Sequence, residues 1–148
     1  MNINETLKHY FGYDSLRPGQ QELIEGILQR KDVLGIMPTG AGKSLCYQVP
    51  ALMLDGITIV VSPLISLMTD QVKALNQAGV HAAYINSSLT ENQIRTALFY
   101  AAQGRYKIIY VAPERLNTIR FLEFACQVDI SMVTVDEAHC ISQWGQDF

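Results

Sequence analysis

Several features are scarce in this 148-residue chain, and each shortage excludes a class of protein. Lys and Arg total 11 against 14 Asp and Glu, a net charge of −3, which argues against nucleic-acid binding through overall charge alone. The polar N-terminus has no apolar signal core. The longest apolar region, 52–68, is broken by Asp55, Gly56 and Pro63, so it does not predict a membrane span. We expect a cytoplasmic protein without membrane contact.

Cysteine is also scarce. The chain has three, Cys46, Cys126 and Cys140, an odd number without a C-x-x-C pair. His139 stands beside Cys140, but no second pair of ligands lies nearby, so a cysteine metal site is disfavoured. We expect three reduced thiols, as is usual in the cytoplasm.

No internal repeat, low-complexity tract or linker divides the sequence. The length of 148 residues is typical of one domain, and 49% of the residues are hydrophobic, enough for a sizeable core.

A glycine-containing loop is the most informative segment of the chain. It follows the apolar run 33–37, which predicts a buried strand, and precedes a helical pattern. Glycine lets backbone N–H groups approach phosphates closely, while Lys43 adds a charge for the β- and γ-phosphates and Ser44 a hydroxyl ligand for Mg²⁺. The predicted phosphate-binding residues are Thr39, Gly40, Ala41, Gly42, Lys43 and Ser44.

The loop departs from the full G-x-x-x-x-G-K-[ST] pattern, because Met37 stands where the pattern has glycine. A chance Gly-Lys-Ser in an ordinary turn is the alternative. The strand before the loop, the helix after it and an acidic motif downstream favour phosphate binding.

The acidic motif follows another apolar run. Residues 132–135 are followed directly by Asp136 and Glu137, which places the two carboxylates at the strand end where open α/β sheets bind ligands. One carboxylate can hold Mg²⁺ and its neighbour can orient the attacking water. The alternative is a solvated pair that begins a helix. Beside the phosphate loop, the motif predicts binding and hydrolysis of a nucleoside triphosphate, with Lys43, Asp136 and Glu137 as catalytic residues.

Apolar runs and amphipathic stretches alternate along the chain, which predicts an α/β fold with a parallel sheet covered on both faces. Pro18 suits the first turn of the second helix, and Thr90 with Gln93 fits a capping box. The expected strands lie near 33–37, 57–61, 81–85, 107–111 and 131–135. The expected helices lie near 4–11, 18–30, 43–54, 64–77, 90–102 and 117–127.

Further segments are more specific than a general ATPase requires, and together they resemble RecQ-family DNA helicases from about residue 7 to the last residue. The resemblance implies a RecA-like P-loop NTPase fold and a 3′-to-5′ ATP-dependent DNA helicase of bacterial, nucleoid-associated type. Met37 is shared with that family's usual phosphate loop. The segments that carry the resemblance are Phe11–Tyr13, Leu16–Gln20, Ser44–Gln48, Val61–Met68, Ala112–Leu116 and Asp136–Gly145.

The resemblance also implies an adenine site. Gln20 matches a glutamine that reads the adenine edge, which an amide can do by donating and accepting hydrogen bonds. Tyr13 and Arg17 match residues that sandwich the adenine ring between an aromatic and a guanidinium plane. From the residues alone, a plain turn before a helix is the favoured interpretation of 17–20.

Contacts with single-stranded and forked DNA are implied as well. Ser62 and Arg115 match positions that touch the strand's backbone, although capping of a helix is a second role for Ser62. Trp144 and Phe148 match the start of an aromatic-rich loop that senses DNA, and ordinary packing is the alternative for Trp144. His139 matches the residue that couples the nucleotide site to that loop, and a polar residue at a helix start is its alternative.

The family continues beyond the segment that this chain matches, so we expect residues 1–148 to be an incomplete first motor domain. The strand after the acidic motif inserts between the strands here expected at 33–37 and 131–135. Without it, we expect one of three outcomes: the two strands pair directly, another chain fills the slot between them, or the region is poorly ordered. We also expect self-association through exposed strand edges. Alternative functions are an isolated nucleotide-binding fragment and a DEAD-box RNA motor, the latter disfavoured by 139–144.

Overall fold

The structure, a computed structural model, describes all residues except 38–41 and 141–148. The chain divides into two compact units, Met1–Asp55 and Gly56–Phe148, and each is described by itself.

The first unit contains three helices, α1 (Ile3–Phe11), α2 (Gln20–Leu28) and α3 (Lys43–Met53). Helix α3 contacts both α1 and α2. A small apolar core forms where the three meet, because each contributes one fully buried side chain. These side chains are Leu7, Ile24 and Val49.

The predicted strand at 33–37 is wrong. Residues 31–37 have no regular structure, and Leu34 and Ile36 are 77% and 88% exposed. A strand needs a partner for its ladder of hydrogen bonds, and this segment belongs to no described sheet. It lies against α2 instead: a Cβ on Gly26 would be 3.0 Å from Val33, and one on Gly35 would be 2.9 Å from Leu23.

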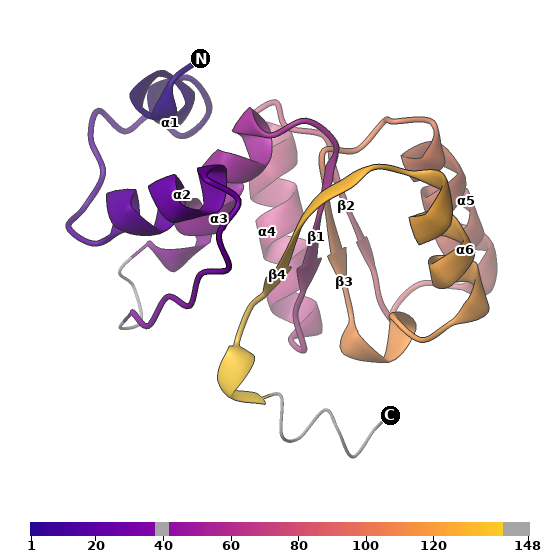
Figure 1. Cartoon of the computed structure of the whole chain (residues 1–148). Helices are drawn as coiled ribbons and strands as arrows, with labels where there is room; N and C mark the ends of the chain where they lie inside the picture. Colours follow the sequence, from indigo (N-terminus) through magenta and orange to yellow (C-terminus); the bar gives the residue numbers. More distant parts are fainter. Residues whose placement is uncertain (38–41, 141–148) are drawn as a thin grey trace. The chain divides into compact units, whose positions relative to one another are not determined.

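The second unit is built on a four-stranded, wholly parallel sheet with the order β2-β3-β1-β4 (Figure 1). Its helices are α4 (Ile65–Gln77), α5 (Glu91–Ala102) and α6 (Ile119–Gln127), with short 3-10 turns η1 (Pro113–Arg115) and η2 (Ala138–Cys140). The strands are β1 (Ile57–Val61), β2 (Ala82–Ile85), β3 (Ile108–Val111) and β4 (Ile130–Val135).

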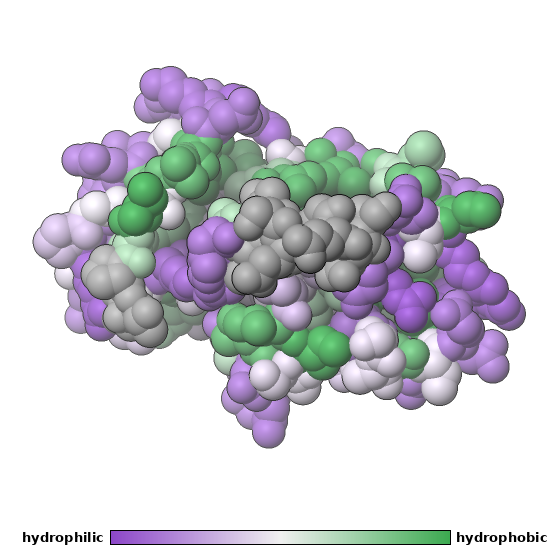
Figure 2. Space-filling view, turned by 90° about the horizontal axis from the view of Figure 1, so that it is seen from below, coloured by the Kyte–Doolittle hydropathy of each residue, from purple (hydrophilic) through white to green (hydrophobic). Residues whose placement is uncertain are grey.

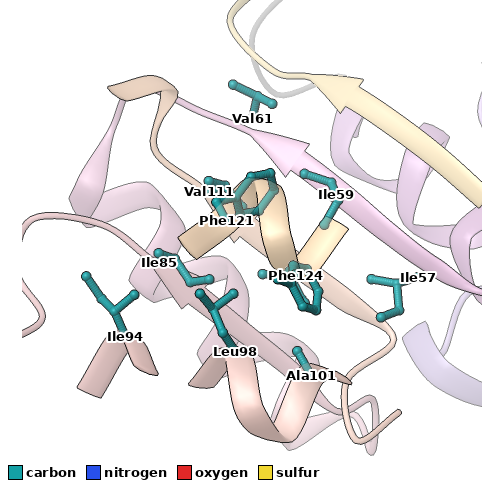
Figure 3. Packing of buried hydrophobic residues seen from close by; sticks show 11 residues of the cluster. Ile57, Ile59, Val61, Ile85, Ile94, Leu98, Ala101, Val111, Phe121 and Phe124 are labelled. Carbon is teal, nitrogen blue, oxygen red and sulfur yellow. The ribbon is translucent and has the colours of Figure 1, made fainter. Parts of the chain in front are cut away.

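The core of this unit lies between the sheet and the pair α5 and α6, where Phe121 and Phe124 pack against the strands (Figure 3). Helix α4 lies on the other side of the strands (Figure 1). Every residue of β1 and β3 is buried, which confirms that these strands are covered on both faces and explains their continuous Val and Ile content.

Strand β4 is the exception to this coverage. Its residues Val133 and Val135 pair in register with Ile59 and Val61, yet they are 61% and 39% exposed. Among the described strands β4 pairs with β1 alone, so its second edge carries no described ladder. Of the three outcomes expected for 33–37 and 131–135, direct pairing does not occur in the described residues.

Element boundaries follow local hydrogen bonds. The predicted capping box of α5 is confirmed, since Thr90 accepts from the Gln93 N–H and Gln93 accepts from that of Thr90. Helix α6 begins at Ile119, later than expected, because Thr118 caps it. Pro18 lies outside α2, because the Gln20 N–H donates to the Arg17 carbonyl (3.1 Å) and closes a turn first.

We expect Gly56→Ala to destabilise the second unit more than Gly79→Ala. Both glycines have a left-handed backbone, φ +90° and +91°, so alanine costs about 1–2 kcal/mol at either position. A Cβ at Gly56 would lie 2.6 Å from the Asp129 carbonyl oxygen, which accepts from the Ile57 N–H at the start of the β1–β4 ladder. A Cβ at Gly79 would have no described heavy atom within 4 Å beyond its own chain neighbours. The clash at Gly56 adds roughly 1–3 kcal/mol. The free energy of unfolding of both variants is measured by urea denaturation. Equal losses in the two variants would contradict the role given to the close approach of Gly56 and Asp129.

Candidate functional site

The phosphate-loop residues that the structure describes sit at the start of α3. Gly42 has a left-handed backbone (φ 74°) and directly precedes Lys43 and Ser44, the first two helical residues. The first turn of this 11-residue helix contains no acidic residue, so its N–H groups and dipole favour an anion. Lys43 is exposed and Ser44 partly buried. The predicted ligands Thr39, Gly40 and Ala41 lie outside the described residues.

Gln20 ties this loop to the start of α2. Its side chain is 1% exposed, and its Nε2 donates to the Gly42 carbonyl (3.0 Å) while its Oε1 accepts from the Arg17 N–H (2.7 Å). A Cβ on Gly42 would lie 2.5 Å from Nε2, so glycine is required for this approach. Sequence reasoning placed Gln20 at an adenine edge and missed this role in holding the loop.

Tyr13 and Arg17, the predicted adenine sandwich, are both exposed, with Tyr13 54% accessible. Arg17 is tied through its backbone to Gln20. Both side chains are thus accessible to a ring, and the turn at 17–20 fixes the backbone of Arg17.

Cys46 lies on the same helix one turn after the loop. Its Sγ is 3.6 Å from the Met37 Sδ and 4.0 Å from the Gly42 carbonyl oxygen. Burial raises the pKa of the Cys46 thiol, so it is a neutral packing group near neutral pH. Among described side chains, Cys46 and Cys126 are free cysteines, and no group of His, Cys, Asp and Glu is suited to a metal.

The acidic motif lies at the carboxyl end of β4. The Asp136 N–H donates to the Val61 carbonyl (2.8 Å), which extends the β4–β1 ladder by one residue. Glu137 then takes a left-handed conformation (φ 55°), and its N–H donates to Asp136 Oδ1 (2.9 Å). Such a backbone is strained for a non-glycine residue and is typical of functional sites.

The Glu137 carboxylate is largely covered, with its side chain 18% exposed, and Oε2 lies 3.4 Å from His139 Nε2. The His139 side chain is 75% exposed. The structure therefore brings Asp136, Glu137 and His139 together on one turn, where Asp136 accepts from the Glu137 N–H and the Glu137 carboxylate lies beside His139.

The loops after β1 and β3 hold the predicted DNA contacts. Ser62 is 1% exposed, and its Oγ accepts from the Leu64 N–H (3.4 Å), so its hydroxyl orders the turn before α4. Arg115 Nη1 lies 3.3 Å from Glu91 Oε1, a pairing that sequence reasoning missed because it depends on the strand order. Figure 2, seen from the side of these strand ends, shows hydrophobic residues among hydrophilic ones. Trp144 and Phe148 lie outside the described residues.

Comparison with known proteins identifies the family. A profile described as "DEAD/DEAH box helicase" matches residues 17–148. The chain belongs to the DEAD/DEAH box helicase family. Helicases of this family use ATP. None of the described helices has the length and apolar character to cross a membrane.

The relatives of this helicase chain include RecQ proteins. It is 54% identical over 143 residues to "ATP-dependent DNA helicase RecQ" of Bacillus subtilis, covering 96% of this chain and 24% of that protein. It is 49% identical to the protein of the same name from Haemophilus influenzae, covering 97% of this chain and 23% of the relative. The predicted resemblance to RecQ helicases is confirmed, and the chain spans about a quarter of these relatives.

Solved helicases confirm the RecA-like fold. The crystal structure of the DUF1998 helicase MrfA bound to DNA and AMPPNP matches with a TM-score of 0.71 at 18% identity, covering 93% of this chain and 20% of that one. The RNA helicase Prp28 from Chaetomium thermophilum bound to ADP matches with a TM-score of 0.65 at 24% identity, covering 95% of this chain and 37% of that one.

We expect Gln20→Glu to destabilise the first unit by about 3 kcal/mol or more, because it places a buried carboxylate against the Gly42 carbonyl that Nε2 now satisfies. The control is Gln21→Glu, whose exposed side chain bonds Glu25 one turn away. This change costs only a few tenths of a kcal/mol, roughly, from like-charge repulsion. Amide exchange of the first unit measures both. Equal protection in the two variants would contradict the role given to Gln20.

Proposed function

We propose that this chain is part of the first RecA-like motor domain of an ATP-dependent DNA helicase that moves 3′ to 5′ along a single strand and unwinds duplexes. The single observation that carries the proposal is the pair of motifs at element ends. Lys43 and Ser44 begin α3, and Asp136 and Glu137 directly follow β4. The names and identities of the RecQ relatives support the choice of DNA.

In this proposal the first unit binds ATP. Lys43 contacts the β- and γ-phosphates, and the N–H groups of the loop and of the α3 start bind phosphate oxygens. Tyr13 and Arg17 stack on adenine, and Gln20 reads its edge once its amide, which is buried in this structure, is uncovered. Because the Gln20 amide also bonds Gly42 and Arg17, occupation of the adenine site acts directly on the phosphate loop.

The chemistry of two oxygen donors supports Mg²⁺ as the metal ion in this proposal. The Ser44 hydroxyl and the Asp136 carboxylate are hard ligands of the kind that Mg²⁺ prefers, and Asp136 is fixed by its ladder bond to Val61. When bound there, Mg²⁺ would supply positive charge beside the phosphates. Glu137 orients and deprotonates the attacking water, and its covered carboxylate close to His139 is held for that task.

The loops at the strand ends bind the DNA strand in this proposal. Arg115 contacts its backbone, the turn ordered by Ser62 offers N–H groups, and Trp144 and Phe148 stack on bases. His139 transmits the state of the nucleotide. The partners are single-stranded and forked DNA, and the location is the bacterial cytoplasm with its nucleoid.

We expect Lys43→Ala in the full-length protein to lower ATP turnover by about 100-fold or more, because it removes a charge that stabilises the transferred phosphoryl group. Lys31→Ala is the control, since Lys31 is exposed in the same unit. The measurement is ATPase activity together with unwinding of forks that carry a 3′ or a 5′ tail. Unchanged turnover in Lys43→Ala, or unwinding from 5′ tails alone, would contradict the proposal.

We expect Glu137→Gln to bind ATP nearly as well as the wild type and to hydrolyse it about 10²–10⁴-fold more slowly, because the amide is a far weaker base. Glu123→Gln, an exposed change on α6, should leave both quantities unchanged. Nucleotide titration and single-turnover hydrolysis separate the two effects. Loss of affinity with intact chemistry would show that Glu137 binds rather than activates.

A further inference from the structure

Arg115 and Glu91 join the loops that follow two neighbouring strands. Arg115 ends η1, which comes after β3, and Glu91 begins α5, which comes after β2. Strands β2 and β3 pair in parallel up to Ile85 and Val111, so both loops leave the same edge of the sheet. The guanidinium Nη1 and the carboxylate Oε1 are 3.3 Å apart, and the side chains are 22% and 63% exposed respectively.

Arg115 precedes the N-terminus of a helix in the chain. Helix α6 begins four residues after Arg115, and the Thr118 hydroxyl at its N-cap donates to the Arg115 carbonyl (2.7 Å). The first turn of α6 contains no acidic residue, so its N-terminal partial charge adds to that of the guanidinium. The carboxylate that pairs with the guanidinium is that of Glu91, at the start of a different helix.

A second carboxylate, that of Glu114, stands directly before Arg115 in the sequence, within η1. Glu114 is exposed and forms no ion pair within the described part of the chain. Proximity in sequence therefore does not decide which carboxylate takes the guanidinium. The fold brings in Glu91 from 24 residues away.

We propose that Glu91 is an internal competitor for the nucleic-acid phosphate that binds Arg115. In the free protein its carboxylate occupies the guanidinium, and a phosphate of the single strand displaces it. The inference rests on the proposed function, which assigns Arg115 to the strand's backbone. The exchange is accessible because an ion pair with one mostly exposed partner is weak, whereas an Arg–phosphate contact also releases counterions from the nucleic acid.

The consequence is that the protein binds the strand with lower affinity and releases it more readily. A phosphate must displace Glu91 before it gains Arg115, and Glu91 recaptures the guanidinium when the phosphate leaves. A motor that steps along DNA has to release each contact repeatedly. Glu91 thus sets the affinity of the strand site without touching the strand, which makes it a positioning residue.

The test is a double-mutant cycle in the full-length protein without nucleotide. Glu91→Gln keeps the shape of the side chain and removes its charge, and Arg115→Ala removes its partner. Glu114→Gln is the matched control, because it removes the same charge one residue from Arg115. The measured quantity is the Kd of a fluorescent single-stranded oligonucleotide, by anisotropy, at several salt concentrations.

We expect Glu91→Gln to tighten binding by about 3–10-fold, Glu114→Gln to change it by less than about 2-fold, and Arg115→Ala to weaken it and lower the salt slope by about 0.7. Glu91→Gln should have no effect when Arg115 is already alanine. Equal tightening in that background would show plain repulsion of the strand by Glu91 and overturn the inference, as would weaker or unchanged binding in the single variant.

Failure of the inference can be told apart from failure of the proposed function. If Arg115→Ala binds the strand as the wild type does, the strand contact of Arg115 is wrong and the inference falls with it. The helicase assignment is then still judged by Lys43→Ala and Glu137→Gln, whose readouts do not depend on Arg115.

Discussion

The parallel ladder centred on β1 is the constraint on which the second unit depends. Its last bonds reach one residue past the strands: Ser62 N–H donates to the Val111 carbonyl, Ala112 N–H to that of Ile85, and Asp136 N–H to that of Val61. Three loops therefore begin at one edge, each at a position fixed by backbone bonds. The loops that carry the functional side chains inherit this precision from the ladder.

In the first unit, a buried side-chain amide fixes the position of the backbone instead of a strand ladder. The buried Gln20 amide bonds the Gly42 carbonyl on one side and the Arg17 N–H on the other, and so fixes the backbone directly before α3. A buried amide with satisfied partners specifies one arrangement, because every displacement leaves a polar atom unpaired. Both units thus position their loops by hydrogen bonds to backbone groups.

These devices differ in how far the sequence predicts them. Strands β1 and β3 were predictable because doubly covered strands are rich in Val and Ile, and the capping box at Thr90 because it is local. The strand at 33–37 was wrong, since an apolar run is a strand only beside a partner. The pairing of Glu91 with Arg115 and the left-handed backbone of Glu137 depend on strand order and on tertiary hydrogen bonds, which no local pattern contains.

Strand order also separates the two charged sites of the second unit. Arg115 and Glu91 lie at the ends of β3 and β2, whereas Asp136 and Glu137 follow β4, and β1 lies between them. Adjacent strands are about 4.8 Å apart, so β3 and β4 are separated by about 10 Å, close to the Debye length of about 8 Å at physiological ionic strength. Direct charge coupling across the edge is therefore weak. The structural link that remains is β1, which bonds both β3 and β4. The Asp136 N–H donates to the carbonyl of Val61, and the next residue, Ser62, donates to the Val111 carbonyl, so a shift of Asp136 is passed to the Ser62 turn through backbone bonds.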